Sequence, residues 1–585
     1  MSKNKLQKLE LTWIGKGDEP KLEPRILIEN PEYSYGDPTT DNILIHGDNL
    51  LGLKALEQDF AGKVKCIYID PPYNTGNAFE HYDDGIEHSL WLNLIYNRLS
   101  ILKNLLSKDG CIFIQLDDNE LDYCKIICDE LFGRDNLINR IAIDVRAPSA
   151  FSTVNPGVFK ASEYLLFYAK DKSNFQEVSA RVIREPDYAY SLWLQNPSDD
   201  FQDWKFENVL NAYRRNNNDR ESTHPRKSLD NYNKFIVSNS ARIARLASIS
   251  DTGAGQQVIE LKKQSQSNRD KIFKLERKAG LDDVYVLNGQ QLIFYKKNVI
   301  EIDGEQQASK LLTNIWSDIA WEGIANEGGV VFKRSKKPER LIKRILELTT
   351  KEGDLILDSF LGSGTTAAVA HKMNRKYIGI ELGEHAKTHC YPRLKAVIDG
   401  EQGGISKTVN WQGGGGFKFY TLAPSLLKQD KFGNWVISQE YNPDMLAAAM
   451  AKQEGFNYLP NEDKFWKQGN SSENDFIFTT TQFLTVETLD SIHDDMQEGE
   501  SILICCKAFQ KECKSKYPNI TLKKIPQMLL DRCEFGKDDY SLNIVNLPTE
   551  EAANLDSEEE NVIDNESVQE IRDNKETVNQ GTLFE

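Results

Sequence analysis

Residues 65–76 read KCIYIDPPYNTG, and they decide the fold of this 585-residue chain. The run 64–69 is short, apolar and rich in β-branched residues, a pattern that predicts a buried parallel strand. The strand must stop at Asp70, because Pro71 and Pro72 cannot donate to a sheet ladder and hold the backbone extended. Open α/β sheets build their sites at the carboxyl ends of strands, so the DPPY turn marks a candidate site.

The DPPY turn suits the binding of a planar base that carries an exocyclic amine. The Asp70 carboxylate and the Pro71 carbonyl are two acceptors that can bind the two amine hydrogens and draw the nitrogen toward tetrahedral geometry. Its lone pair, otherwise delocalised into the ring, then becomes available for in-line attack on a methyl group. Tyr73 can stack on a base that has been flipped out of a duplex. The alternative is a strand that merely ends in a Pro-rich turn.

A second motif, DLILDSFLGSGTTAAVA, occupies residues 354–370. Gly362 and Gly364 allow close approach of the backbone to a ligand, and the start of the next helix offers unpaired N–H groups to a carboxylate. The pattern predicts a strand at 355–357, a glycine turn at 360–364, an amphipathic helix at 365–373 and a strand at 377–380.

Glu381 follows that last strand, 17 residues beyond Gly364, where an acid can accept both hydroxyls of a ribose. A dinucleotide fingerprint needs a third glycine where Ala367 stands, so F-x-G-x-G describes the turn better. S-adenosylmethionine therefore suits the motif better than NAD. The candidate cofactor contacts here are Asp358, Phe360, Gly362, Ser363, Gly364, Thr365 and Glu381.

Together the two motifs resemble the amino-methyltransferases of DNA in the permuted (β) order, with the catalytic half first. More closely, the chain resembles the modification subunit of type III restriction–modification systems. The segments that carry the resemblance are DPPYNTG (70–76), FEHYDD (79–84), WLNLIYNRL (91–99), DSFLGSGTT (358–366), DFIFTTT (475–481) and KKIPQMLL (523–530).

The resemblance implies a doubly wound α/β fold with a mostly parallel, seven-stranded methyltransferase sheet in permuted order. It also implies S-adenosylmethionine as cofactor, the N6 amine of adenine in double-stranded DNA as substrate, a homodimer, and a helicase–nuclease restriction subunit as partner. The expected parts are an N-terminal extension (1–40), the catalytic half (41–170), a target-recognition insertion (171–327), the cofactor half (328–422), a C-terminal α/β assembly domain (432–545) and an acidic, disordered tail (547–585).

Several alternatives stay open. Methylation of the N4 amine of cytosine is the nearest, and Asp rather than Ser before Pro-Pro-Tyr favours adenine only as a family tendency. An orphan methyltransferase, a DNA-binding module that has lost turnover and a nicotinamide dehydrogenase are more distant. The sequence carries no ATP or nuclease motif, so cleavage would belong to a partner.

Two further polar clusters have competing interpretations. The resemblance places Asp48 at the adenine end of the cofactor, whereas the sequence alone allows it to cap a helix expected at 50–60. Paired acids at 117–120 could bind a metal, but methyl transfer needs none and a helix start explains them more simply. The resemblance also places Lys337 and Pro338 under the methionine end of the cofactor.

The expected insertion interleaves aromatic residues with Arg and Asn, and residues 201–250 hold nine Lys and Arg against five Asp and Glu. Helices are predicted at 240–246 and 257–281. The alternative to DNA recognition is an ordinary solvated surface. The candidate contacts to phosphates or base edges are Arg214, Arg215, Arg220 and Lys227.

Amino-acid composition limits the classes of protein to which this chain can belong, but does not select one. The net charge is −18, but residues 550–585 contribute 12 acids and two bases, and a DNA footprint needs only a local basic surface. Nine cysteines without a C-x-x-C pair predict no zinc site. The absence of a long apolar run or a signal-peptide core predicts a cytoplasmic protein.

Overall fold

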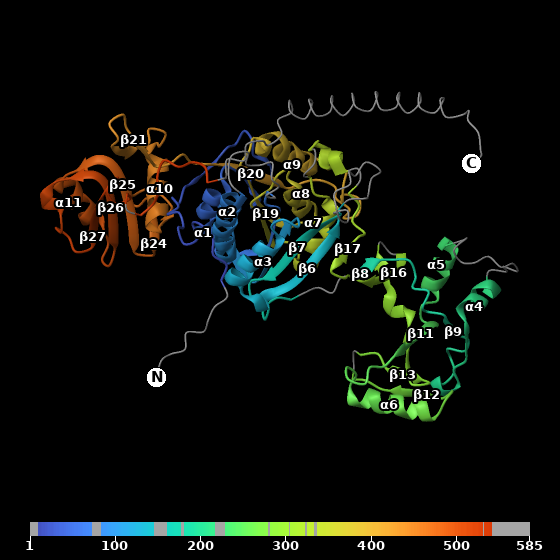
Figure 1. The fold of residues 1–585 in the computed structure, drawn as a ribbon. Helices are drawn as coiled ribbons and strands as arrows, with labels where there is room; N and C mark the ends of the chain where they lie inside the picture. The colour runs from blue at the N-terminus through green and yellow to red at the C-terminus, as the bar shows by residue number, and fades with distance from the viewer. Residues whose placement is uncertain are drawn as a thin grey trace, which may run out of the picture. The chain divides into compact units, whose positions relative to one another are not determined.

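The computed structural model describes residues 10–72, 84–145, 161–176, 181–216, 229–278, 281–302, 305–321, 324–332, 336–530 and 532–540. The chain divides into two compact units (Figure 1). One unit combines Met1–Glu177 with Asn314–Glu585, and the other is Val178–Thr313. The second unit begins and ends inside the insertion expected at 171–327.

An eleven-stranded sheet forms the core of the first unit. Its order is β1 (Leu27–Glu29), β20 (Gly416–Leu422), β3 (Ile43–His46), β19 (Lys376–Glu381), β18 (Leu355–Asp358), β4 (Val64–Ile69), β5 (Leu106–Leu116), β7 (Ser162–Ala169), β6 (Leu137–Asp144) and β17 (Ile315–Trp316), with β2 (Tyr35–Gly36) paired to β20. The five strands from β3 to β5 are parallel, and β7 is antiparallel to both its neighbours. The predicted doubly wound, mostly parallel sheet is confirmed.

The two sequence motifs meet at the centre of this sheet. Strand β4 is predicted correctly to the residue, and it pairs with β18 through Ile67 opposite Leu357. The chain leaves β18 toward β19 on one side and leaves β4 toward β5 on the other, so the switch in strand order falls between the two motifs. Ligands of such sheets bind at this point.

Helices cover both faces of the sheet (Figure 1). Those of the catalytic half are α1 (Asn49–Phe60), α2 (Asp84–Leu105) and α3 (Leu121–Cys128), and they share one hydrophobic cluster with the sheet. The helices of the cofactor half contact one another in turn, and they are α7 (Glu339–Thr349), α8 (Thr365–Lys372) and α9 (Tyr391–Ile398). None of the described helices is long and apolar enough to cross a membrane.

A buried ion cluster joins the three helices of the cofactor half. Glu339, the first residue of α7, lies 2.8 Å from Lys372 on α8 and 2.8 Å from Arg393 on α9, and all three side chains are fully buried. Arg393 also donates to the hydroxyl of Thr365 at 2.7 Å and to the carbonyl of Ser363 at 3.3 Å. This cluster therefore fixes the start of α8, where the glycine turn ends.

The second unit is built on a six-stranded sheet. Its order is β10 (Phe206–Asn208), β9 (Leu192–Leu194), β11 (Ile243–Ser248), β14 (Gln290–Phe294), β13 (Val284–Leu287) and β12 (Ile272–Leu275). A smaller sheet contains β15 (Val299–Ile302), β16 (Glu305–Leu311) and β8 (Arg181–Ile183), and the helices are α4 (Val209–Asn216), α5 (Leu229–Ser238) and α6 (Gln256–Ser267).

Two helix predictions in this unit are wrong. The segment predicted as a helix at 240–246 contains most of β11, which pairs with β9 and β14. The helix predicted at 257–281 ends at Ser267, and β12 follows it. Short apolar runs fit either structure, and pairing with distant strands decides between them.

The C-terminal part of the first unit forms a separate five-stranded sheet. Its strands are β23 (Asn457–Tyr458), β24 (Gly469–Ser472), β25 (Asp475–Leu484), β26 (Ser501–Phe509) and β27 (Ile520–Lys524), of which the last three are parallel. It is accompanied by the hairpin β21 (Leu427–Gln429) and β22 (Trp435–Ile437) and by helices α10 (Pro443–Glu454) and α11 (Val486–Asp495).

Glu339→Gln tests the buried ion cluster. The substitution leaves the buried Arg393 facing a neutral amide, while Lys372 keeps its pair with Glu401, and removal of one partner of a buried pair costs roughly 3–5 kcal/mol. We expect the free energy of unfolding of the cofactor half to fall by about that amount in calorimetry. Glu347→Gln, on the same helix, breaks only the exposed pair with Lys343 and should cost about 0.5 kcal/mol or less. Equal losses of unfolding free energy in the two variants would contradict a stabilising role of the buried ion cluster.

Candidate active site at the carboxyl ends of β4, β18 and β19

An ammonium group holds Asp70 where β4 ends. The Nζ atom of Lys337 lies 3.1 Å from Oδ2 of Asp70 and 3.1 Å from Oε2 of Glu163. The Lys337 side chain is only 9% exposed. Burial lowers the pKa of Lys337, but the carboxylates of Asp70 and Glu163 more than offset this and raise it above the ordinary value. Lys337 therefore stays charged and fixes the position of Asp70.

Glu163 is itself anchored to the sheet. Its carboxylate, on β7, accepts from the side-chain amide of Gln115 on β5, and Gln115 accepts from the hydroxyl of Tyr68 on β4 at 2.6 Å. Neither Gln115 nor Glu163 is among the site residues predicted from the sequence. A signal was present, because each is a polar residue next to an apolar run, near the carboxyl end of GCIFIQL and near the amino end of SEYLLFY.

The DPPY turn is held from α2. The indole N–H of Trp91 donates to the carbonyl of Pro72 at 2.8 Å, and Trp91 is buried. Pro71 is buried and Pro72 is half-buried. Tyr73 lies outside the described residues, so its stacking on a base stays a prediction.

Glu381 contacts the glycine turn directly. One of its carboxylate oxygens accepts from the N–H of Gly362 at 2.7 Å, and the other accepts from the N–H of Gly383 at 3.1 Å. Gly362 and Gly364 have φ of +56° and +81°, a conformation that disfavours side chains. Gly364 caps α8 without a side-chain hydrogen bond, so the first-turn N–H groups of this helix are available to an anion.

Asp358 ends β18 between the other two acids. Its carboxylate accepts from the N–H of Phe360 at 2.9 Å and from the hydroxyl of Thr366 at 2.6 Å. Burial raises the pKa of Asp358 to about 7, and the charges of Asp70 and Glu381 push it in the same direction. Three carboxylates thus gather at neighbouring strand ends, and their combined field favours a cationic ligand.

Asp48 caps a helix, the alternative that the sequence left open. One oxygen accepts from the N–H of Leu51 at the start of α1 at 3.0 Å, and the other accepts from the N–H of Tyr540 at 2.9 Å. Arg98 lies 3.6 Å away. The carboxylate is buried, and a role at the adenine end of a cofactor stays a prediction.

Two of the four predicted DNA contacts, Arg214 and Arg215, lie on α4. Arg214 is exposed, whereas Arg215 is paired with Glu207 at 2.5 Å. Arg220 and Lys227 lie outside the described residues. Trp193 and Tyr213 are buried in the core of the second unit. Within the described part of the chain, no group of three or more His, Cys, Asp or Glu side chains could hold a metal ion.

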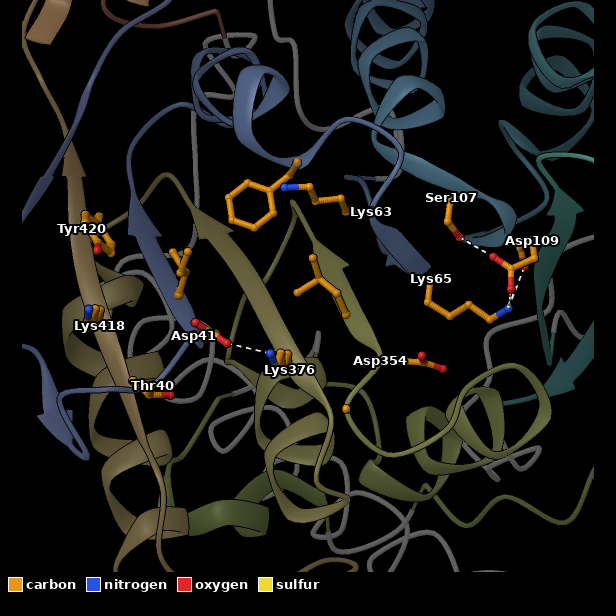
Figure 2. A pocket seen from close by; sticks show the side chains of 14 residues that line it. Thr40, Asp41, Lys63, Lys65, Ser107, Asp109, Asp354, Lys376, Lys418 and Tyr420 are labelled. Atoms are coloured by element: carbon orange, nitrogen blue, oxygen red, sulfur yellow. Dashed lines mark hydrogen bonds and ion pairs between the residues drawn. The ribbon is translucent and has the colours of Figure 1, made fainter. Parts of the chain in front are cut away.

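A hollow of about 610 Å³ lies at the opposite, amino-terminal edge of the same sheet (Figure 2). Its charges are mixed, and two of its lysines are paired within it, Lys65 with Asp109 at 2.7 Å and Lys376 with Asp41 at 2.6 Å (Figure 2). None of the residues of the two motifs' turns lines it. We therefore place the candidate site at the carboxyl edge, where the turns of both motifs lie.

Comparison with known proteins identifies the family of the chain. The family described as DNA methylase (N6/N4 methyltransferases) matches residues 64–391, which is more than half of the chain and includes both motifs. The chain belongs to the DNA methylase family. The resemblance predicted from DPPY and F-x-G-x-G is confirmed.

Individual relatives are modification subunits. The chain is 36% identical over 430 residues to the probable type III restriction-modification enzyme HindVI Mod subunit of Haemophilus influenzae, covering 68% of this chain and 56% of that protein. It is 28% identical to the EcoPI Mod subunit of Escherichia phage P1 (63% and 62% covered) and 26% identical to the EcoP15I Mod subunit of Escherichia coli (72% of each). The chain thus spans less than two thirds of the first two relatives.

Asp358→Asn should reveal the buried acid of the methylase site through its pH dependence. Because the pKa of Asp358 is raised from 3.8 to about 7, the folded chain holds an extra proton between those values. The stability from that proton is complete below pH 4 and is lost as the pH rises through 7. Asn mimics the protonated acid, so the thermal midpoints of the two proteins should agree near pH 4, and wild type should fall below the variant by pH 8. A constant difference across this range would contradict the raised pKa.

Proposed function

We propose that this chain is a site-specific DNA methyltransferase that transfers a methyl group from S-adenosylmethionine to the N6 amine of a flipped adenine. We further propose that it serves as the modification and recognition subunit of a type III restriction–modification system. The observation that carries the proposal is the Asp70 carboxylate, fixed by Lys337 at the end of β4, beside the glycine turn that follows β18. Membership of the DNA methylase family and similarity to Mod subunits support it.

The residues present fit S-adenosylmethionine. When bound, this cofactor supplies an electrophilic methyl group on a cationic sulfonium. The first-turn N–H groups of α8 suit its carboxylate, and Glu381 is placed to accept from ribose hydroxyls. The gathered carboxylates of Asp70, Asp358 and Glu381 favour its positive charges over a neutral ligand.

Asp70 and Pro71 would act on the target amine. The Asp70 carboxylate and the Pro71 carbonyl accept the two amine hydrogens, which turns the nitrogen lone pair toward the methyl carbon. As the N–C bond forms and the C–S bond breaks, positive charge develops on the amine, and the nearby carboxylate stabilises it. The amine then releases one proton, for which Asp70 is an acceptor in contact. Lys337 keeps this carboxylate in position.

Asp70→Ala tests this mechanism. We expect methyl transfer to duplex DNA to fall at least about 100-fold, because the charge that stabilises the developing cation is removed. The dissociation constant for S-adenosylmethionine, measured by calorimetry, should change little, because the glycine turn and Glu381 are untouched. Asp109→Ala is the matched control, since it breaks the ion pair with Lys65 at the other end of β4 and should leave both quantities unchanged. Equal losses of cofactor affinity and turnover in Asp70→Ala would show that Asp70 belongs to cofactor binding.

We propose that the second unit, Val178–Thr313, recognises the target sequence. It folds around its own sheet and hydrophobic clusters, and in the sequence it lies between the catalytic half and the cofactor half. Replacing residues 178–313 with the corresponding unit of a relative of different specificity should transfer that specificity. A folded, active hybrid that still methylates the original sequence would place recognition elsewhere.

We also propose that the chain works as a homodimer with a helicase–nuclease partner. Support comes from the relatives, which are named as Mod subunits of restriction–modification enzymes, and from the C-terminal sheet, which lies outside the methyltransferase sheet. A mass near that of one chain, 66.7 kDa, in light scattering at micromolar concentration would contradict the dimer.

A further inference from the structure

Charge is divided sharply along the C-terminal part of the chain. Residues 430–506 hold 14 Asp and Glu against four Lys, a net charge of −10. Residues 507–532 hold seven Lys and Arg against two acids, a net charge of +5. The basic stretch includes the ends of β26 and β27, which are parallel, so it supplies the carboxyl edge of this sheet.

A hollow of about 590 Å³ lies at this edge. It is lined by Lys511, Lys514, Lys523 and Lys524 and by no Asp or Glu, while Phe509, Leu522 and Met528 supply apolar surface. Edges of this kind, where parallel strands end, are where open α/β sheets bind ligands.

The lysines of the hollow differ in how they are compensated. Lys523 is paired at 2.6 Å with Glu454, which is 5% exposed and also binds Arg532 at 2.6 Å. Lys524 lies over the ring of Phe509, 5.0 Å from its centre. Among the described residues, no carboxylate lies within 4.0 Å of the ammonium groups of Lys511, Lys514 or Lys524. The hollow therefore carries about three uncompensated positive charges.

This arrangement is unlike that of the hollow in Figure 2, where Lys65 and Lys376 have carboxylates of the same lining as partners. Like charges held side by side repel, and an anion that neutralises them together stabilises the arrangement. Lysine is a compact point charge without the planar fork of arginine, so it contacts phosphate without demanding a fixed geometry.

We propose that the lysine hollow of the C-terminal sheet binds the phosphodiester backbone of duplex DNA, independently of sequence and in addition to the methyltransferase site. The phosphates of a duplex are regularly spaced, and several can meet Lys511, Lys514 and Lys524 together, while the apolar lining can pack against sugars. Lysine contacts to phosphate carry no sequence information, and the one neutral polar side chain in the lining is that of Gln527. The inference rests on the proposed function only in taking DNA as the polyanion that the chain meets.

The test is the triple variant Lys511→Gln, Lys514→Gln, Lys524→Gln in the full chain. Binding to a long fluorescent duplex without a target site is measured over a range of salt concentrations, without cofactor. Each lost phosphate contact should reduce the slope of log K against log salt by about 0.9, so the slope should fall by roughly 2 to 3. Methylation of a short duplex that just contains the target should stay at the wild-type rate.

Two control variants separate charge from structure. The corresponding Lys→Arg triple variant keeps the charges and should restore the wild-type slope. A Lys63→Gln, Lys376→Gln, Lys418→Gln variant removes three charges from the hollow of Figure 2 and should leave the slope unchanged. An equal reduction in this control would show that only overall charge matters, and that result would overturn the proposal.

Other outcomes also decide the matter. An unchanged slope of log K against log salt in the Lys→Gln triple variant overturns the proposal. The proposal is also overturned if deleting residues 550–585 from that variant restores the wild-type slope. That result would identify the acidic tail as the occupant of the hollow. Loss of capture of a nuclease partner with unchanged DNA binding would make the hollow a protein-docking surface instead. Failure of the wild-type chain to methylate any DNA would contradict the proposed function. It would leave the DNA-binding proposal intact, because the binding assay needs no turnover.

Discussion

The ammonium group of Lys337 is the contact on which the methyltransferase site depends. It reaches from the entry to α7 in the cofactor half to Asp70 and Glu163 in the catalytic half, residues far apart in the sequence. Two residues later, Glu339 binds Arg393, which holds the start of α8. One short segment therefore sets the distance between Asp70, which we propose contacts the base, and the glycine turn, which we propose contacts the cofactor. Small errors in such a distance are costly for methyl transfer, which needs in-line geometry.

The electrostatics of the site follow from this arrangement. Asp70, Asp358 and Glu381 are held close together by the ends of neighbouring strands, and burial, with a smaller contribution from the charges of Asp70 and Glu381, raises the pKa of Asp358. The positive charge of Lys337 offsets part of the negative charge of these carboxylates. A cationic cofactor would offset more, so the free site is best suited to a ligand that brings positive charge with it.

The centre of the fold could be predicted from sequence because it depends on local patterns. The strand at 64–69 is an apolar run directly followed by Asp70, the strand at 355–358 is one that ends at Asp358, and Pro or Gly residues follow both within a few positions. Other features depend on partners that are distant in sequence. Neither the pairing of β11 nor the burial of Arg393 against Glu339 leaves a local signal. Glu163 is an intermediate case, since its polarity within an apolar strand was visible but its partner Lys337 was not.

The most direct measurement is single-molecule sequencing of DNA from cells that express this chain, beside cells that express the Asp70→Ala variant. We expect N6-methyladenine at one short sequence in the first sample and none in the second. N4-methylcytosine at that sequence, or unmodified DNA in cells that contain the folded wild-type chain, would contradict the assignment.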